Sequence, residues 1–116
     1  MDDIIDLKEV MERVQDDREL LMELIQIFLD DCPPKITALR KAADEKNFVQ
    51  IADLAHAMKG SSGNLAAKKI SGIFLQIEQL GRQQKTENIN GLLDQVERYL
   101  GDVRVYLGKL KNEKPG

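Results

Sequence analysis

Cysteine, histidine, proline and aromatic residues are all scarce in this chain, and their scarcity excludes several classes of protein. The sequence has one Cys, one His, three Pro, two Tyr, three Phe and no Trp. The lone Cys32 has no partner for an internal disulfide, which indicates a reducing compartment. One His and one distant Cys do not make a usual zinc ligand set, so we expect no metal site.

Long apolar runs and an excess of positive charge are missing as well. No stretch approaches the roughly 20 apolar residues that span a bilayer, and the first residues lack the basic region of a signal peptide. A net charge of −3 and a pI of about 5.2 disfavour nucleic acid as a partner. We therefore expect a cytoplasmic protein that binds neither membranes nor nucleic acid. Its 116 residues suit one domain, with a polar tail from about residue 111.

The residues that are abundant favour helices, and the apolar positions recur at helical spacing almost throughout. A short first helix is expected around residues 7–14. Asp16 and Glu19 resemble a capping box for a second helix, which runs to the pair Pro33-Pro34. Proline disfavours a helix interior but is tolerated in the first turn of a helix. Pro34 therefore either begins a new helix or lies in a kinked continuation of the second helix. We favour the kinked continuation.

Three more helices are expected in the second half. Asn47 is a good N-cap for a helix through residues 48–58, residues 63–66 form a break, and the next helix covers residues 70–80, where Gly81 weakens the last turns. Thr86 is the expected cap of a final helix. The apolar residues of that final helix alternate steps of four and three, as in an antiparallel bundle: Ile89, Leu93, Val96, Leu100, Val103, Leu107 and Leu110. The predicted fold is all-α, an antiparallel four-helix bundle with a short extra N-terminal helix.

The single histidine, His56, is the first candidate for chemistry. At 100° per residue it lies about 140° from the centre of the apolar arc of its helix, so it should face solvent. Ala52, Gly60 and Gly63 lie on nearby faces and leave room for another protein to approach. Glycine within a helix costs roughly 1 kcal/mol, which makes Gly60 a locally unfavourable choice that close approach would explain. Lys59 could place an ammonium beside a phosphoryl group on the imidazole.

The segment HAMKGSSGNL, residues 56–65, resembles the signature of histidine-containing phosphotransfer (HPt) domains, and the resemblance extends over essentially the whole chain. It implies a phosphorelay intermediate. His56 would accept a phosphoryl group from a receiver-domain phosphoaspartate and pass it to another receiver, with Lys59 stabilising the phosphoryl group. Partners would dock on Ala52, Gly60, Gly63 and Gln79.

The same resemblance implies a shuttle that is not an enzyme with its own ATP site and that binds no cofactor. Mg²⁺ would come from the receiver. The expected partners are response-regulator receiver domains, a hybrid sensor histidine kinase, or both, and the chain is expected to be monomeric.

The sequence departs from the HPt pattern at two positions. Ala66 stands where the family often has Gly, which predicts a differently shaped turn between helices. Glu78 stands where many members have a Gln that is hydrogen-bonded near the active histidine. A carboxylate touching the ring would favour the protonated imidazole and repel phosphate. We therefore expect Glu78 to point to solvent and Gln79 to provide the orienting contact.

Other functions fit the residues less well. A Ser61 or Ser62 nucleophile would have to meet His56, yet the helical angles place both away from the ring. Lys59-Gly60-Ser61 resembles part of a phosphate-binding loop, but the upstream glycine spacing and strand are missing. Cys32 is expected to be a packing or surface residue. The serious alternative is a helical interaction module that docks receivers without being phosphorylated.

Overall fold

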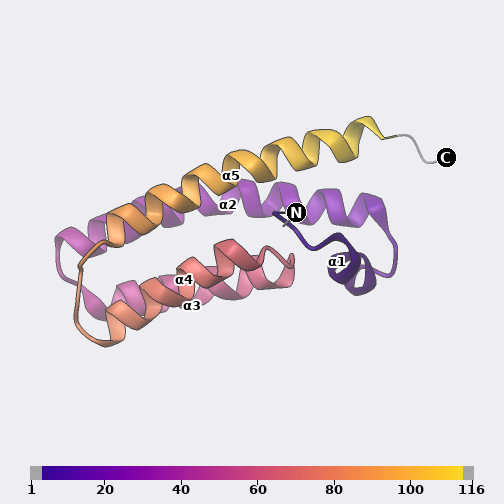
Figure 1. The fold of residues 1–116 in the computed structure, drawn as a ribbon. Helices are drawn as coiled ribbons and strands as arrows, with labels where there is room; N and C mark the ends of the chain where they lie inside the picture. The colour runs from indigo at the N-terminus through magenta and orange to yellow at the C-terminus, as the bar shows by residue number, and fades with distance from the viewer. Residues whose placement is uncertain (1–3, 114–116) are drawn as a thin grey trace.

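The computed structural model describes residues 4–113, which form five α-helices and no β-strand. The all-α bundle predicted from the sequence is confirmed, including the short extra helix at the N-terminal side. The helices follow one another along the chain with short connections (Figure 1): α1 (Leu7–Arg13), α2 (Arg18–Asp44), α3 (Phe48–Asn64), α4 (Lys68–Arg82) and α5 (Ile89–Asn112).

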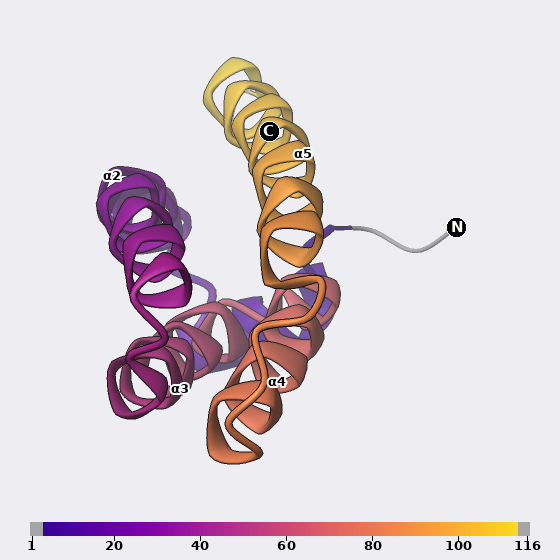
Figure 2. The same ribbon diagram turned by 90° about the vertical axis from the view of Figure 1, so that its left-hand side faces the viewer.

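Helices α2 and α5 are much longer than α3 and α4, and this difference sets the shape of the molecule. The α3–α4 hairpin lies along one half of the α2 and α5 pair, and α1 lies near the other half, below α2 (Figure 1). Seen end-on, the four main helices stand around a common interior (Figure 2). The molecule is accordingly elongated, with extents of 51 × 25 × 21 Å. Among the described helices, none combines the length and apolar character needed to cross a membrane.

Helix α2 passes through Pro33 and Pro34 without ending, which confirms that the helix continues through the pair, while the predicted kink stays a prediction. A proline has no N–H to donate, so these two positions leave earlier carbonyls of the helix without their usual partners. The helix is held on both sides of the pair by buried apolar residues, which include Phe28, Leu29 and Ile36. Tertiary packing therefore overrides the local preference for a break.

Two predicted N-caps are wrong by one or two residues, and one is confirmed. Asp17, and not Asp16, caps α2 by accepting a hydrogen bond from the Leu20 N–H at 3.0 Å. Asp16 has φ 61° because it lies in the turn that closes α1. Helix α5 begins after Asn88, which has φ 62° and makes no side-chain cap, and not after Thr86. Asn47 does cap α3.

The apolar series of the last helix is buried in full, which confirms the predicted bundle seam. All seven of its residues are 5% exposed or less. Helix α5 also continues through Lys111 to Asn112, and Glu113 forms an ion pair with Arg18, so the predicted polar tail from residue 111 begins as helix. Residues 114–116 of that tail lie outside the described part of the chain.

Gly81 allows α3 and α4 to approach closely. A Cβ added there would lie 2.9 Å from the Ala52 nitrogen and 3.1 Å from the Phe48 carbonyl oxygen, both on the backbone of α3. Helix α4 continues past Gly81 to Arg82, so any weakening of its last turns by the glycine does not end the helix there. The glycine is a packing requirement of the α3–α4 hairpin.

The turn from α3 to α4 is shaped as a glycine turn although alanine occupies it. Ala66 has φ 56°, a left-handed conformation that glycine adopts more easily, and it is 2% exposed. Its carbonyl accepts a hydrogen bond from the Asp6 N–H at 3.0 Å. Packing therefore holds an alanine in a conformation that suits glycine, and the predicted difference in turn shape stays a prediction.

Candidate functional site

Helix α3 presents His56 to solvent, as predicted from its angle on the helix. Asn47 begins the helix by accepting a hydrogen bond from the Gln50 N–H at 3.2 Å. Ile51, Ala55 and Met58 are buried beneath it and fix its rotation about its own axis. The side chain of His56 is 63% exposed. His56 is therefore a surface residue and not part of the hydrophobic core.

Glu78 of α4 lies beneath the His56 ring, which corrects the expectation that it would point to solvent. Its side chain is only 4% exposed, and its Oε2 atom is 2.9 Å from His56 Nδ1. Gln79, expected to make this contact, is exposed. The rotation of α4 about its own axis explains the error. One residue further along a helix turns the side chain by about 100°, which places Gln79 among the exposed residues.

Two cations surround the same carboxylate. The Lys59 ammonium is 2.8 Å from Glu78 Oε1, and an Arg82 guanidinium nitrogen is 2.8 Å from Oε2. The ammonium of Lys59, followed by the guanidinium of Arg82, lowers the pKa of Glu78 to about 2, against a smaller opposing effect of burial. Glu78 is therefore ionised at neutral pH. One anion between two cations leaves a net charge of +1 beside the imidazole.

The contact with Glu78 determines which nitrogen of His56 is available. An ionised carboxylate accepts hydrogen bonds and donates none, so the bond to Nδ1 requires a proton on Nδ1. In the neutral ring the lone pair then lies on Nε2, the nitrogen on the far side of the ring from this bond. The imidazole has a fixed tautomer with its nucleophilic nitrogen directed away from Glu78.

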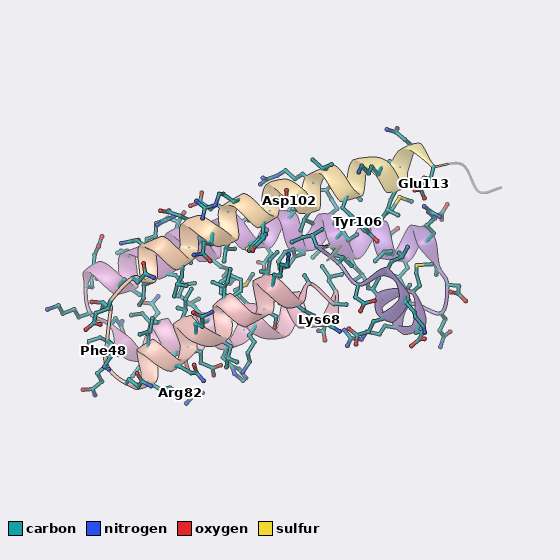
Figure 3. All side chains as sticks on the ribbon, viewed as in Figure 1. Phe48, Lys68, Arg82, Asp102, Tyr106 and Glu113 are labelled. Atoms are coloured by element: carbon teal, nitrogen blue, oxygen red, sulfur yellow. The ribbon has the colours of Figure 1, made fainter. Side chains whose placement is uncertain are left out.

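Arg82 is a site residue that the sequence analysis missed. It lies four residues after Glu78 on α4, the spacing at which opposite charges meet on a helix, and this spacing was the available signal. Its side chain is 64% exposed and projects from the edge of the bundle near the end of α4 (Figure 3). Because Arg82 and His56 bond the same carboxylate oxygen, the guanidinium lies close to the ring.

The predicted docking residues lie in different environments around His56. Gly60 is fully open, since a Cβ added there would have no neighbour within 4 Å. Ala52 and Gly63 are half-buried on the side of α3 that faces α4. A Cβ on Gly63 would lie 3.6 Å from the Ser71 hydroxyl. Gln79 is exposed on α4, so it remains a predicted docking residue although it does not orient the histidine.

The hydroxyl groups near the motif are bonded to their own helix. Ser61 donates to the Ala57 carbonyl at 3.2 Å, and the buried Ser62 donates to the Met58 carbonyl at 2.7 Å. Neither hydroxyl is paired with the imidazole, so nothing supports a serine nucleophile with His56 as base. Within residues 4–113, no three His, Cys, Asp or Glu side chains are grouped in a way that could hold a metal ion.

The bundle presents one exposed histidine whose tautomer is fixed and which lies beside two cations. These features define a class of small helical protein that can carry an anionic group on the ring. The comparisons with known proteins identify the family. Residues 23–106 match the Hpt domain, and the chain belongs to this family. The match includes α3, α4 and every residue of the cluster around His56.

Similar proteins carry names of the same kind. The chain is 32% identical over 95 residues to the phosphorelay intermediate protein YPD1 of Saccharomyces cerevisiae, covering 76% of this chain and 57% of that protein. It is 25% identical over 92 residues to histidine-containing phosphotransfer protein 2 of Arabidopsis thaliana, covering 75% and 59% respectively. The chain thus spans somewhat more than half the length of these relatives.

A solved structure shares the fold. The crystal structure of histidine-containing phosphotransfer protein B from Pseudomonas aeruginosa PAO1 superimposes with a TM-score of 0.83, covering 95% of this chain and 96% of that one at 20% sequence identity. At this identity the likeness concerns the arrangement of the helices.

Proposed function

We propose that this protein is a phosphorelay intermediate in which His56 accepts a phosphoryl group from the phosphoaspartate of one receiver domain and passes it to another. The observation that carries the proposal is the bond between Glu78 and Nδ1, which leaves Nε2 of an exposed ring as the nucleophile. Membership in the Hpt family and the names of the relatives support the same role.

The transfer needs little from this chain beyond position and charge. The Nε2 lone pair forms a bond to phosphorus while the phosphorus–oxygen bond to the aspartyl group breaks, and the electron pair of that bond returns to the aspartate carboxylate. The reverse step regenerates the free imidazole. Lys59 is held by Glu78 in the resting protein, and its flexible side chain can turn to the phosphoryl oxygens once the phosphoryl group is present.

The partners proposed are response-regulator receiver domains, a hybrid sensor histidine kinase, or both, and the protein acts as a cytoplasmic monomer. The receiver would supply Mg²⁺, because both oxygens of Glu78 are already paired with cations and, within residues 4–113, no three His, Cys, Asp or Glu side chains are grouped to hold a metal ion. No ATP site of its own is proposed. Docking would use the open surface at Gly60 and the exposed Gln79 on α4.

The proposal is tested by mixing the protein with receiver domains that carry ³²P-labelled phosphoaspartate. Label should move to the wild-type protein and be lost in acid, as expected of phosphohistidine. His56→Gln should receive none. Because His56 is the sole histidine in the sequence, no other histidine remains in this variant to carry the label. Lys59→Ala should slow the transfer while leaving the helical spectrum unchanged.

The alternative of a docking module without phosphorylation makes the opposite prediction. Receivers would then bind the wild-type protein and His56→Gln equally well, and neither would take up acid-labile label. Nothing in the geometry favours this alternative, since a docking surface alone does not require a buried carboxylate under the ring.

A further inference from the structure

The group beneath His56 is a carboxylate, and a carboxylate distinguishes two states of a phosphorylated ring that an amide would not. After Nε2 has been phosphorylated, Nδ1 either keeps its proton, giving a cationic ring, or loses it, giving a neutral ring with a lone pair on Nδ1. A glutamine could accept from the first state through its oxygen or donate to the second through its nitrogen. Ionised Glu78 can only accept, so it stabilises the protonated state alone.

We propose that Glu78 is a positioning residue that keeps the Nδ1 proton on phosphorylated His56 and thereby makes the phosphoryl group more labile than it would be above a glutamine. The inference rests on the proposed function, since it concerns the phosphorylated form of the same ring. When water, or the aspartate of a receiver, attacks the phosphorus, its oxygen forms the new bond to phosphorus, the nitrogen–phosphorus bond breaks and the electron pair of that bond returns to Nε2. If Nδ1 carries a proton, the leaving group is a neutral imidazole; without that proton it would be an imidazolate anion, a much poorer leaving group.

The charges around the ring support this assignment and come from two helices. Lys59 and the exposed Asp53 lie on α3 within one turn of His56, and Glu78 and Arg82 lie on α4. Within residues 4–113, the ring of His56 makes its hydrogen bond to Glu78 and none to α2. The carboxylate is the one group that bonds the ring, and it is held in place by two cations and by burial to 4% exposure.

Lys59 and Arg82 have a second effect that acts in the same direction when Glu78 is replaced. In the wild-type protein their charges are partly neutralised by the carboxylate. In Glu78→Gln both cations would be uncompensated, so they would hold the phosphoryl dianion more firmly and oppose a proton on Nδ1. Both effects predict that the glutamine variant carries a longer-lived phosphoryl group.

The test measures the lifetime of the phosphorylated protein without any receiver. Wild-type protein and Glu78→Gln are phosphorylated with phosphoramidate, freed of the reagent, and followed by ³¹P NMR between pH 6 and pH 9. The matched control is the double variant Glu78→Gln/Gln79→Glu, which keeps the composition and net charge but moves the carboxylate to an exposed position. Circular dichroism checks that each variant is folded.

We expect the phosphoryl group of Glu78→Gln to decay about tenfold more slowly than that of the wild-type protein above pH 7.5. A charge-assisted hydrogen bond is roughly twice as strong as a neutral one, and a tenfold change in the fraction of rings that keep the proton corresponds to about 1.4 kcal/mol. The double variant should behave like Glu78→Gln. The difference in lifetime between the wild-type protein and the two variants should become smaller as the pH falls.

A second measurement needs no variant. The ¹⁵N signals of the single imidazole report directly whether Nδ1 is protonated in the phosphorylated wild-type protein. We expect the proton to persist to higher pH in the folded protein than in the same chain unfolded in urea, because only the folded protein places Glu78 against Nδ1. Equal midpoints in the two states, or equal lifetimes of wild type and Glu78→Gln at every pH, would overturn the inference. Failure of the wild-type protein to carry phosphate on His56 would instead overturn the proposed function.

Discussion

Replacing Gly81 with alanine should destabilise the protein, although alanine is the better helix former. The new Cβ would lie 2.9 Å from the Ala52 nitrogen and 3.1 Å from the Phe48 carbonyl oxygen. Both are backbone atoms, so no side-chain rotation relieves the overlap. Helix α4 must therefore move away from α3, which also separates Glu78 from His56.

The magnitude follows from two opposing terms. Alanine gains about 1 kcal/mol of helix propensity over glycine, whereas overpacking a tight contact costs about 1–3 kcal/mol. Because the overlap is with backbone, the cost lies near the upper end, and we expect a net loss of about 2 kcal/mol in the free energy of unfolding. For a domain of this size that is a fall of roughly 8 °C in Tm.

Gly72 provides the matched control on the same helix. A Cβ there would meet nothing within 4 Å, so Gly72→Ala should gain roughly 0.5–1 kcal/mol from helix propensity alone. Both variants are compared with the wild-type protein by urea unfolding and calorimetry. If Gly81→Ala proves as stable as Gly72→Ala, close packing of α3 on α4 is not what requires the glycine, and our reasoning fails.

Three other predictions concern the docking surface, the Cys32 thiol and the loss of stability at acid pH. Gly60→Trp should weaken receiver binding at least tenfold in a calorimetric titration while changing Tm by only a few degrees, since the new side chain enters open space; equal affinity would contradict the docking surface. Burial raises the pKa of Cys32 to about 12, so a thiol reagent at pH 8 should label it only after unfolding, and rapid labelling of the native protein would show that the site is open. The pKa of Glu78 is lowered from 4.5 to about 2, so its contribution is complete above pH 4.5 and lost as the pH falls toward 2. Between pH 4.5 and pH 2 the wild-type protein should lose about 1–2 kcal/mol more unfolding free energy than Glu78→Gln, after allowance for solvent screening. The same dependence of unfolding free energy on pH in both proteins would refute this.

Helical periodicity predicted the fold well because each helix buries one continuous face. The seam of α5 and the outward direction of His56 both follow from counting 100° per residue. The exact caps did not follow, because neighbouring Asp16 and Asp17 are equally good caps and the path of the chain out of α1 selects the second. The same limit applies to Thr86, since the turn after α4 consumes two more residues than expected.

The candidate site was only half predictable, because its second half belongs to another helix. Lys59 follows from its position one turn after His56, whereas Glu78 depends on how α4 is rotated against α3. On α4, Glu78 lies at the edge of the apolar arc formed by Phe74, Ile77 and Gly81, and an edge residue can turn either way. We expected Glu78 in solvent because a carboxylate at the ring would repel phosphate. That argument did not count Arg82, whose charge together with that of Lys59 compensates the carboxylate.

Helix α1 is far from the imidazole along the chain, yet it holds the end of the helix that bears it. Arg13 bonds the Gly63 carbonyl, fifty residues away in sequence, and the Asp6 N–H bonds the Ala66 carbonyl. A helix of only seven residues is not stable by itself and survives through burial of side chains such as Val10. Local opening of this shortest helix would remove both bonds from the α3–α4 turn, so the anchoring of the end of α3 depends on the least independent segment of the described chain.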